Sequence, residues 1–120
     1  MRIVPVELGD RRYEVLIGDG ARHELPGVVA STVPQAKRAV VVTQPGIGVL
    51  VDPGVPFDRL TVPDGEEAKT LSEVEHLCRA FAQAGLSRSD VIIAVGGGVV
   101  TDLVGYAAST WASRVVATLM

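Results

Sequence analysis

Short apolar runs alternate with segments of helical periodicity along this chain of 120 residues. The apolar runs predict strands at residues 2–8, 13–17, 39–43, 57–62, 91–95 and 115–119. Helical spacing predicts a helix at residues 70–84, with a short one at 21–25. Residues 103–110, which follow the glycine turn, are apolar and small almost all round, so they predict a helix buried between the sheet and a neighbour, with Gly105 allowing a close approach. Residues 26–38 read as loop or weak helix, and residues 45–56 form a helix poorly because they contain three prolines and three glycines. Strands that alternate with helices predict an α/β fold with a largely parallel sheet.

The pattern within each strand predicts its place in the sheet. The runs at residues 39–43 and 91–95 are apolar without alternation, which is typical of parallel strands covered on both faces. Gly9 and Asp10 separate the first two strands and predict an N-terminal hairpin. Pro5 places the first strand at an edge of the sheet, because proline cannot donate to a strand ladder.

The helix at residues 70–84 carries signals at both ends. Thr70 with Glu73 forms a capping-box pattern, Ser72 with Glu75 repeats it two residues later, and Gly85 suits the C-terminal cap. One face of the helix is predicted to pack against the sheet, and its members are Leu71, Val74, Leu77, Cys78, Phe81 and Ala82.

Three consecutive glycines follow the predicted strand at residues 91–95. Gly96, Gly97 and Gly98 remove every side chain where the chain turns into a helix, so bare N–H groups at the helix N-terminus can approach a phosphate. The dinucleotide-binding turn of a Rossmann-like sheet works in this way, although Thr101 stands where its third small residue is expected. No Gly-Lys-Ser/Thr follows, so the turn is not a Walker loop. A tight turn without a ligand is the alternative, and three glycines favour the phosphate role.

Asp102 is predicted to lie in the first turn of the helix that follows the glycines. It either complements the helix dipole or accepts a hydrogen bond from a sugar or substrate hydroxyl beside the phosphate. The candidate cofactor residues of this turn are Gly97, Gly98, Val99, Val100, Thr101 and Asp102.

A second candidate segment, residues 64–69, lies between a predicted strand and a predicted helix. It consists of Asp64, Gly65, Glu66, Glu67, Ala68 and Lys69. In isolation such a cluster is usual for a solvated turn. Its position at a strand-to-helix edge raises the alternative that its carboxylates hold ribose hydroxyls and its lysine supplies a donor or a positive charge. Thr43 and Gln44, which end another strand, either lie beside a cofactor or simply open a connection.

Composition excludes several other classes of protein. A net charge of −3 and 4% aromatic residues argue against nucleic acid or an anionic membrane as partner, and no apolar run is long enough to span a bilayer. The single cysteine, Cys78, is interpreted as structural, and His76 as solvated. One cysteine and no signal-peptide pattern predict a cytoplasmic protein. No Ser-His-Asp, Cys-His or metal-binding cluster is visible in the sequence. The candidate residues that the sequence does contain are those of part of a cofactor site.

Two stretches together resemble the 3-dehydroquinate synthase family. They are Asp64-Gly-Glu-Glu-Ala-Lys-Thr-Leu71 and Gly96-Gly-Gly-Val-Val-Thr-Asp-Leu-Val-Gly-Tyr106. Glycines followed by an acidic residue are shared with the iron-dependent alcohol and glycerol dehydrogenases. The Asp-Gly-Glu-Glu-x-Lys stretch discriminates between them, because it is typical of the sugar-phosphate cyclases.

The resemblance implies that residues 1–120 are a partial N-terminal NAD-binding domain, incomplete at its C-terminus. Complete members continue into a helical domain that carries a divalent metal, zinc or cobalt. They act as homodimers that convert the sugar phosphate 3-deoxy-D-arabino-heptulosonate 7-phosphate to 3-dehydroquinate in the shikimate pathway, with transient oxidation by NAD and release of phosphate. The resemblance assigns direct cofactor contacts to Glu66 and Lys69, the pyrophosphate to Gly97 and Gly98, and the nicotinamide side to Asp102.

The resemblance has departures that limit it. The family often has an acidic residue or asparagine where Gln44 stands, so no adenosine-ribose role is assigned to Gln44. Near the end, Arg114 is shifted from the family's arginine and the Pro-Thr-Thr segment is missing, so Arg114 receives no phosphate-binding role. His23 and His76 match neither histidine ligand of the family. The chain is therefore expected to be inactive alone. The alternatives are another sugar-phosphate cyclase, an iron-dependent polyol dehydrogenase relative, or a non-catalytic nucleotide-binding relic.

Overall fold

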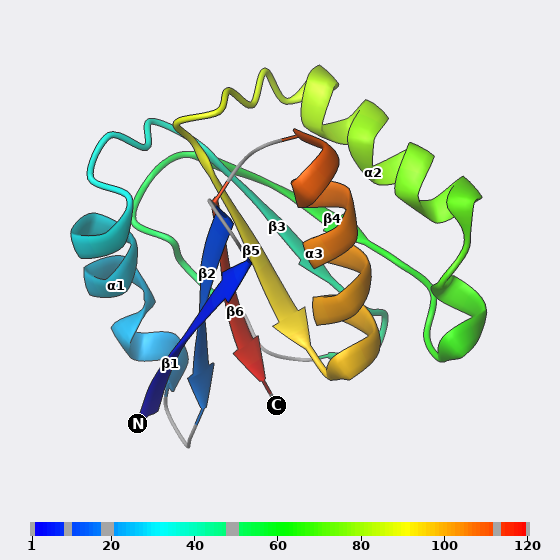
Figure 1. Cartoon of the computed structure of the whole chain (residues 1–120), viewed down its shortest axis with the longest axis horizontal. Helices are drawn as coiled ribbons and strands as arrows, with labels where there is room; N and C mark the ends of the chain where they lie inside the picture. Colours follow the sequence, from blue (N-terminus) through cyan, green and yellow to red (C-terminus); the bar gives the residue numbers. More distant parts are fainter. Residues whose placement is uncertain (1, 9–10, 18–20, 48–50, 112–113, 120) are drawn as a thin grey trace.

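A six-stranded sheet forms the centre of the molecule (Figure 1). The computed structural model describes residues 2–8, 11–17, 21–47, 51–111 and 114–119. The strands are β1 (Arg2–Leu8), β2 (Arg11–Ile17), β3 (Ala39–Thr43), β4 (Phe57–Thr61), β5 (Val91–Gly96) and β6 (Arg114–Leu119), and their order across the sheet is β1-β2-β6-β5-β3-β4. The pair β1–β2 is antiparallel and the other four described pairs are parallel. The predicted α/β class and the N-terminal edge hairpin are confirmed, with Pro5 on an edge strand. The predicted turn at Gly9 and Asp10 lies outside the described residues.

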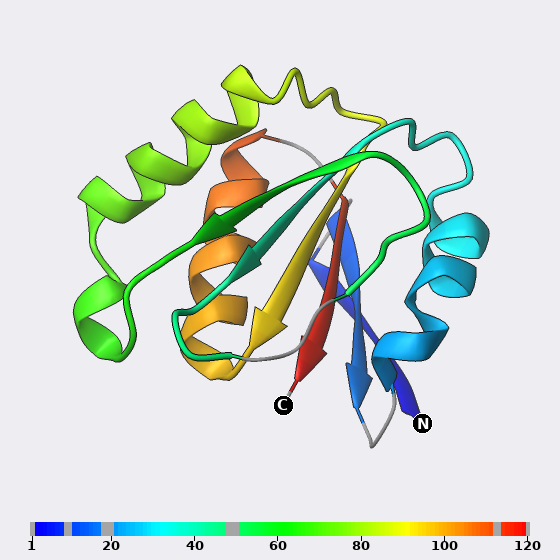
Figure 2. The same cartoon turned by 180° about the vertical axis from the view of Figure 1, so that it is seen from behind.

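Helices cover both faces of the sheet (Figures 1 and 2). A 3₁₀ turn, η1 (Ala21–Glu24), leads into α1 (Leu25–Thr32) on one face, and α2 (Leu71–Gln83) and α3 (Gly98–Trp111) lie on the other. The predicted short helical segment at residues 21–25 is confirmed as η1, and α1 confirms the helical alternative for the first part of residues 26–38. Only the predicted break before Pro26 is wrong, because α1 begins at Leu25 and continues through Pro26 to Thr32. Proline is tolerated in the first turn of a helix, where its missing N–H has no partner to lose.

The strands β3 and β5 pack on both sides. Val40 and Val42 face α2 and α3, while Ala39 and Val41 face α1. All residues of these two strands are buried, which explains why their sequences are apolar without alternation. Two hydrophobic clusters therefore share the central strands, and the carboxyl ends of β3 and β5 are held in fixed positions.

The ends of α2 follow the predicted signals. Thr70 Oγ1 accepts a hydrogen bond of 3.1 Å from the Glu73 amide, while the Glu73 carboxyl oxygen Oε2 is buried and makes no reciprocal bond among the described residues. At the other end Gly85 adopts φ +71°, and the Leu86 amide donates to the Phe81 carbonyl over 3.1 Å. This is a Schellman motif, in which glycine takes the left-handed conformation without a Cβ penalty.

We expect Thr70→Ala to lower the free energy of unfolding by about 1 kcal/mol, because the first turn of α2 loses its side-chain cap. The matched control is Ser72→Ala, since Ser72 is exposed and belongs to the second capping pattern, which the structure does not use. Urea unfolding of both variants measures the difference. An equal loss for the two variants would contradict the assignment of Thr70 as the cap.

The predicted packed face of α2 is only partly correct. Leu77 and Phe81 are fully buried, and Val74 and Cys78 are half-buried, but Leu71 is 79% exposed and Ala82 is exposed as well. Periodicity identifies which face of a helix packs against the protein. It does not show over what length of the helix that face is covered by other residues. Leu71 instead lines an open groove between α2 and α3.

Helix α3 is less enclosed than its composition predicts. Leu103, Val104 and Ala107 are buried, but Tyr106 is 57% exposed. The prediction that another segment closely approaches Gly105 is also wrong, because a Cβ built on Gly105 meets nothing within 4 Å. Within the described part of the chain, none of the helices has the length and apolar character that crossing a membrane requires.

Asp90 joins the loops that precede β3 and β5. It is 4% exposed and accepts hydrogen bonds from the Lys37, Arg38 and Ser87 amides and from Ser87 Oγ, over 2.9–3.2 Å. Burial alone would raise the pKa of this carboxyl, but the four hydrogen bonds outweigh it and hold the pKa below its ordinary value. No local pattern in the sequence indicates this network, since its partners are separated by up to 53 residues.

Candidate functional site

The strands β3 and β5 are neighbours whose connections leave on opposite faces of the sheet. After β3, the described residues 44–47 and 51–56 lie on the face of α1, where Ile47, Val51 and Val55 pack. After β5, the chain enters α3 on the other face. In open α/β sheets this arrangement is a topological switch point, and the crevice at the carboxyl ends of the two strands is the usual ligand site. Both candidate segments from the sequence lie along this edge of the sheet.

The glycine turn lies at this switch point. Gly96 has φ +151°, and a Cβ there would lie 3.1 Å from Val100 Cγ2 and 3.2 Å from Gln44 Oε1, so the position requires glycine for the fold itself. Gly97 and Gly98 are exposed, and Cβ atoms built on them would meet nothing within 4 Å. A ligand can therefore approach the bare backbone at the start of α3, where unpaired N–H groups and the helix dipole favour an anion.

The next residues of α3 fix the turn rather than face a ligand. Val100 is fully buried in the core beneath α3, and Val99 is half-buried against it. The Thr101 hydroxyl donates back to the Gly98 carbonyl over 3.1 Å and lies 3.4 Å from the Gly97 carbonyl. Of the predicted turn residues, Gly97 and Gly98 thus present backbone to the crevice, while Val100 anchors the turn.

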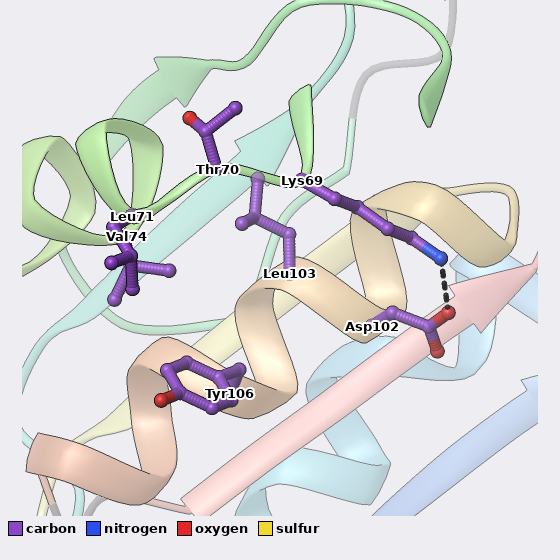
Figure 3. A pocket seen from close by; sticks show the side chains of 7 residues that line it. All are labelled: Lys69, Thr70, Leu71, Val74, Asp102, Leu103 and Tyr106. Atoms are coloured by element: carbon purple, nitrogen blue, oxygen red, sulfur yellow. Dashed lines mark hydrogen bonds and ion pairs between the residues drawn. The ribbon is translucent and has the colours of Figure 1, made fainter. Parts of the chain in front are cut away.

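The charged segment at residues 64–69 forms a short turn beside α3. Gly65 has φ +78°, and η2 (Glu66–Ala68) follows it. Asp64, Glu66 and Glu67 are exposed. Lys69 Nζ lies 3.2 Å from Glu66 Oε2. It also lies 3.0 Å from Asp102 Oδ2, the ion pair drawn in Figure 3. The hydrogen bonds to Asp102 and then to Glu66 raise the pKa of Lys69.

Asp102 does not lie in the first turn of α3, which corrects the sequence prediction. The helix begins at Gly98 and its first turn contains no acidic residue. Asp102 is one turn further along, where it accepts the hydrogen bond from Lys69 instead of complementing the helix dipole. This ion pair joins two segments 33 residues apart, so the structure brings the charged segment and the glycine-turn helix into one site.

An apolar groove continues from the ion pair along the space between α2 and α3 (Figure 3). Its volume is about 390 Å³, and it is lined by Lys69, Thr70, Leu71, Val74, Asp102, Leu103 and Tyr106. No local pattern in the sequence predicts this groove. The groove depends on the exposure of Leu71 and Tyr106, and no local pattern in the sequence indicates that either side chain is exposed.

Gln44, which follows Thr43 at the end of β3, also borders the glycine turn. Gln44 Oε1 lies close to Gly96, as described above. Thr43 is 2% exposed, and its Oγ1 has no hydrogen-bond partner among the described residues. The structure therefore brings Gln44 next to the glycine turn, whereas Thr43 is buried in the strand.

Other candidate groups lie apart from this site or are structural. Cys78 is half-buried with Sγ 3.3 Å from Thr110 Oγ1, and His76 is exposed, as expected. His23 is exposed in η1. The described residues contain no group of three or more His, Cys, Asp or Glu side chains that could hold a metal ion. Arg114 begins β6.

The fold and the site define a doubly wound α/β domain with a glycine-rich turn at its switch point. The sequence model of the 3-dehydroquinate synthase N-terminal family matches residues 59–119, a stretch that contains both candidate segments. The chain belongs to this family.

Curated relatives agree with this result, and a solved structure has the same fold. A protein of Amycolatopsis mediterranei with the provisional name aminodehydroquinate synthase is 46% identical over 108 residues, which are 90% of this chain and 30% of that protein. The 3-dehydroquinate synthase of Symbiobacterium thermophilum is 35% identical over 115 residues, 88% of this chain and 32% of that protein. A crystal structure of 2-deoxy-scyllo-inosose synthase with carbaglucose-6-phosphate, NAD+ and Co2+ has the same fold, with a TM-score of 0.68, 21% identity, and coverage of 98% of this chain and 34% of its own. The chain thus spans about a third of the length of the proteins that it matches.

Proposed function

We propose that this chain is the NAD-binding part of a 3-dehydroquinate synthase. The observation that carries the proposal is the exposed glycine backbone at the switch point, joined by the Lys69–Asp102 ion pair to the charged segment. Membership of the family supports it, as does the NAD+ in the related cyclase structure. Residues 1–120 then form part of the N-terminal domain of that enzyme.

Each group at the site has a role in this proposal. The amides at Gly97 and Gly98 bind the pyrophosphate, and the start of α3 adds its dipole. Glu66, with Asp64 and Glu67 beside it, accepts hydrogen bonds from ribose hydroxyls, and Asp102 lies toward the nicotinamide. Gly65 and Ala68 shape the turn that presents these carboxylates.

Lys69 has a balancing role at the same site. A pyrophosphate near Glu66 and Asp102 is repelled by their two negative charges. The Lys69 ammonium contacts both carboxylates. By pairing with these carboxylates it lowers the repulsion toward the cofactor and keeps the charged segment against α3 before the cofactor binds.

The proposed reaction is the cyclisation of 3-deoxy-D-arabino-heptulosonate 7-phosphate to 3-dehydroquinate with release of phosphate. NAD supplies the transient oxidation of a substrate carbinol when bound. The residues described here bind and orient the cofactor and do not fit a metal, since they contain no suitable cluster. In this proposal the divalent metal and the catalytic lysines belong to parts of the relatives that this chain does not match. The enzyme as a whole is proposed to be a cytoplasmic homodimer.

An aminodehydroquinate synthase is the second candidate, because the Amycolatopsis relative is 46% identical whereas the 3-dehydroquinate synthase of Symbiobacterium is 35% identical. Both candidates use the same cofactor site and differ in the sugar phosphate. Phosphate release, measured with the heptulosonate phosphate and with its amino-substituted analogue, distinguishes them in the whole enzyme. Preference for the amino substrate would favour the second candidate.

Titration of the chain with NAD+ tests the proposal, and Lys69→Gln tests the site. We expect saturable binding to the wild-type chain and a dissociation constant about three- to tenfold higher for Lys69→Gln, because Glu66 and Asp102 then repel the pyrophosphate without compensation. Lys37→Gln is the matched control, since Lys37 is exposed and precedes the amino end of β3, away from the crevice. Isothermal titration calorimetry measures all three. No saturable heat with the folded wild-type chain would refute the proposed function.

A further inference from the structure

A second pocket lies at the opposite edge of the sheet from the glycine turn. Its volume is about 220 Å³, and the charged residues that line it are Lys37, Arg38 and Asp58. Lys37 and Arg38 precede β3, and Asp58 is near the start of β4, so the pocket lies at the amino ends of these two strands. The proposed cofactor crevice lies at their carboxyl ends, about 15 Å away for strands of five residues. The two sites are therefore separate.

The two cations of this pocket have backbone positions that Asp90 fixes. Asp90 Oδ1 accepts hydrogen bonds from the Lys37 and Arg38 amides over 3.0 and 3.2 Å. The Arg38 guanidinium is held as well, because its Nη1 donates to the Ala84 carbonyl at the end of α2 over 2.9 Å. Within the described part of the chain, neither the Lys37 ammonium nor the Arg38 guanidinium forms an ion pair with a carboxylate. The pocket thus presents two positive charges without a charged partner.

Asp58 brings a negative charge to the same face of the sheet. It pairs in register with Val40, which faces α2 and α3, and the Arg38 guanidinium contacts the end of α2 on that face. Asp58 lies one strand across from Arg38 and two residues further along, which corresponds to about 8 Å between their Cα atoms. Asp58 also forms no ion pair with any described residue. One small molecule can therefore contact charges of both signs.

This combination of charges restricts the class of ligand. A simple anion pairs with the two cations but is repelled by Asp58, and a simple cation pairs with Asp58 but is repelled by Lys37 and Arg38. An α-amino acid carries a carboxylate and an ammonium group on one carbon atom. Charge-assisted hydrogen bonds of about 2.8 Å on either side let it span the separation between Arg38 and Asp58. The volume of about 220 Å³ is also below the roughly 300–1,000 Å³ of pockets for drug-sized ligands, which suits a molecule of this size.

We propose that this pocket binds a small zwitterion of the α-amino acid class. The carboxylate of the ligand lies between Lys37 and Arg38, and its ammonium group contacts Asp58. Pro56 and Ala84 supply apolar lining for the rest of the ligand. The inference goes beyond the proposed function and does not depend on it, because the pocket and the cofactor crevice lie at opposite edges of the sheet.

Titration of the ¹⁵N-labelled wild-type chain with L-alanine, followed by NMR at low ionic strength, tests the inference. We expect saturable shifts centred on the amides of Lys37, Arg38 and Asp58. Propionate lacks the ammonium group and ethylamine lacks the carboxylate, so each loses an ion pair and meets an uncompensated like charge. Their dissociation constants should be at least about fivefold higher than that of L-alanine.

Asp58→Asn tests the position of the ammonium group. It should raise the dissociation constant for L-alanine about three- to fivefold and lower the constant for propionate, because it removes an attraction for one ligand and a repulsion for the other. Damage to the fold would weaken both ligands, so opposite changes identify a direct contact. Glu75→Gln is the matched control, since Glu75 is an exposed carboxylate of α2 outside the pocket, and both constants should stay unchanged.

The wild-type chain alone can overturn the inference. Equal dissociation constants for L-alanine and propionate would show a site for anions only, and the absence of saturable shifts at the three amides would show no site. An unchanged ratio of the two constants in Asp58→Asn would overturn the inference as well. None of these outcomes bears on the binding of NAD+, which a separate titration measures.

Discussion

Replacement of Asp90 by alanine is expected to destabilise the chain by about 3 kcal/mol at neutral pH, because hydrogen bonds to charged groups contribute about 1.5–3 kcal/mol and their donors become unsatisfied. Asp90 is 4% exposed and is the common acceptor for amides that precede β3 and β5. Its loss removes a link between two loops at the amino ends of the central strands. The effect should appear as a lower urea midpoint.

The matched control is Asp58→Ala, since Asp58 is an exposed carboxylate on the edge strand β4. Exposed substitutions of this kind usually change stability by less than about 0.5 kcal/mol. Similar losses for the two variants would show that Asp90 has no special role, and the interpretation of its hydrogen bonds would then be wrong.

The stability conferred by Asp90 should also depend on pH. The pKa of Asp90 is lowered in the folded chain, so the folded state stabilises the charged carboxylate relative to the unfolded state. The contribution is therefore complete above the unfolded pKa of about 3.9 and is lost as the pH falls below that value toward the lowered folded pKa. Urea unfolding at pH 7 and at pH 3 should show the difference between wild type and Asp90→Ala shrinking at the lower pH.

Local signals in the sequence were sufficient for most elements of the fold. The unbroken apolar runs of β3 and β5 predict strands covered on both faces, and Pro5 predicts an edge strand. The boundaries of α2 follow from Thr70 and Gly85, which act within one turn of their own position. Each of these features depends on residues that are neighbours in the chain.

The remaining features depend on contacts between distant residues. The strand β6 lies between β2 and β5, and no local pattern indicates which strands a parallel strand will join. The exposure of Leu71 and the pairing of Lys69 with Asp102 depend on how α2 and η2 sit against α3. The glycine turn was therefore predictable as a candidate phosphate site, whereas the partner of Asp102 and the groove were not.

Substitution of Gly97 by alanine should separate ligand binding from folding more clearly than any other change at the site. A Cβ on Gly97 meets nothing within 4 Å, and the φ of Gly97 lies outside the left-handed region. The free energy of unfolding of the ligand-free variant should therefore be unchanged or higher by up to about 1 kcal/mol. The same methyl group projects where the proposed pyrophosphate approaches the backbone. Overpacking of this kind costs about 1–3 kcal/mol, so the dissociation constant for NAD+ should rise by about 10- to 100-fold.

Gly105→Ala is the control for the Gly97 variant, since it makes the same chemical change in α3 with equally free space around the new Cβ. It should leave the NAD+ dissociation constant unchanged and stabilise the helix by about 0.5–1 kcal/mol. Gly96→Ala is not informative for binding, because φ +151° and contacts of 3.1–3.3 Å strain the fold itself. If Gly97→Ala bound NAD+ as tightly as wild type, the pyrophosphate could not lie against this turn. A loss of affinity confined to Gly97→Ala would place the cofactor at the bare backbone between β5 and α3.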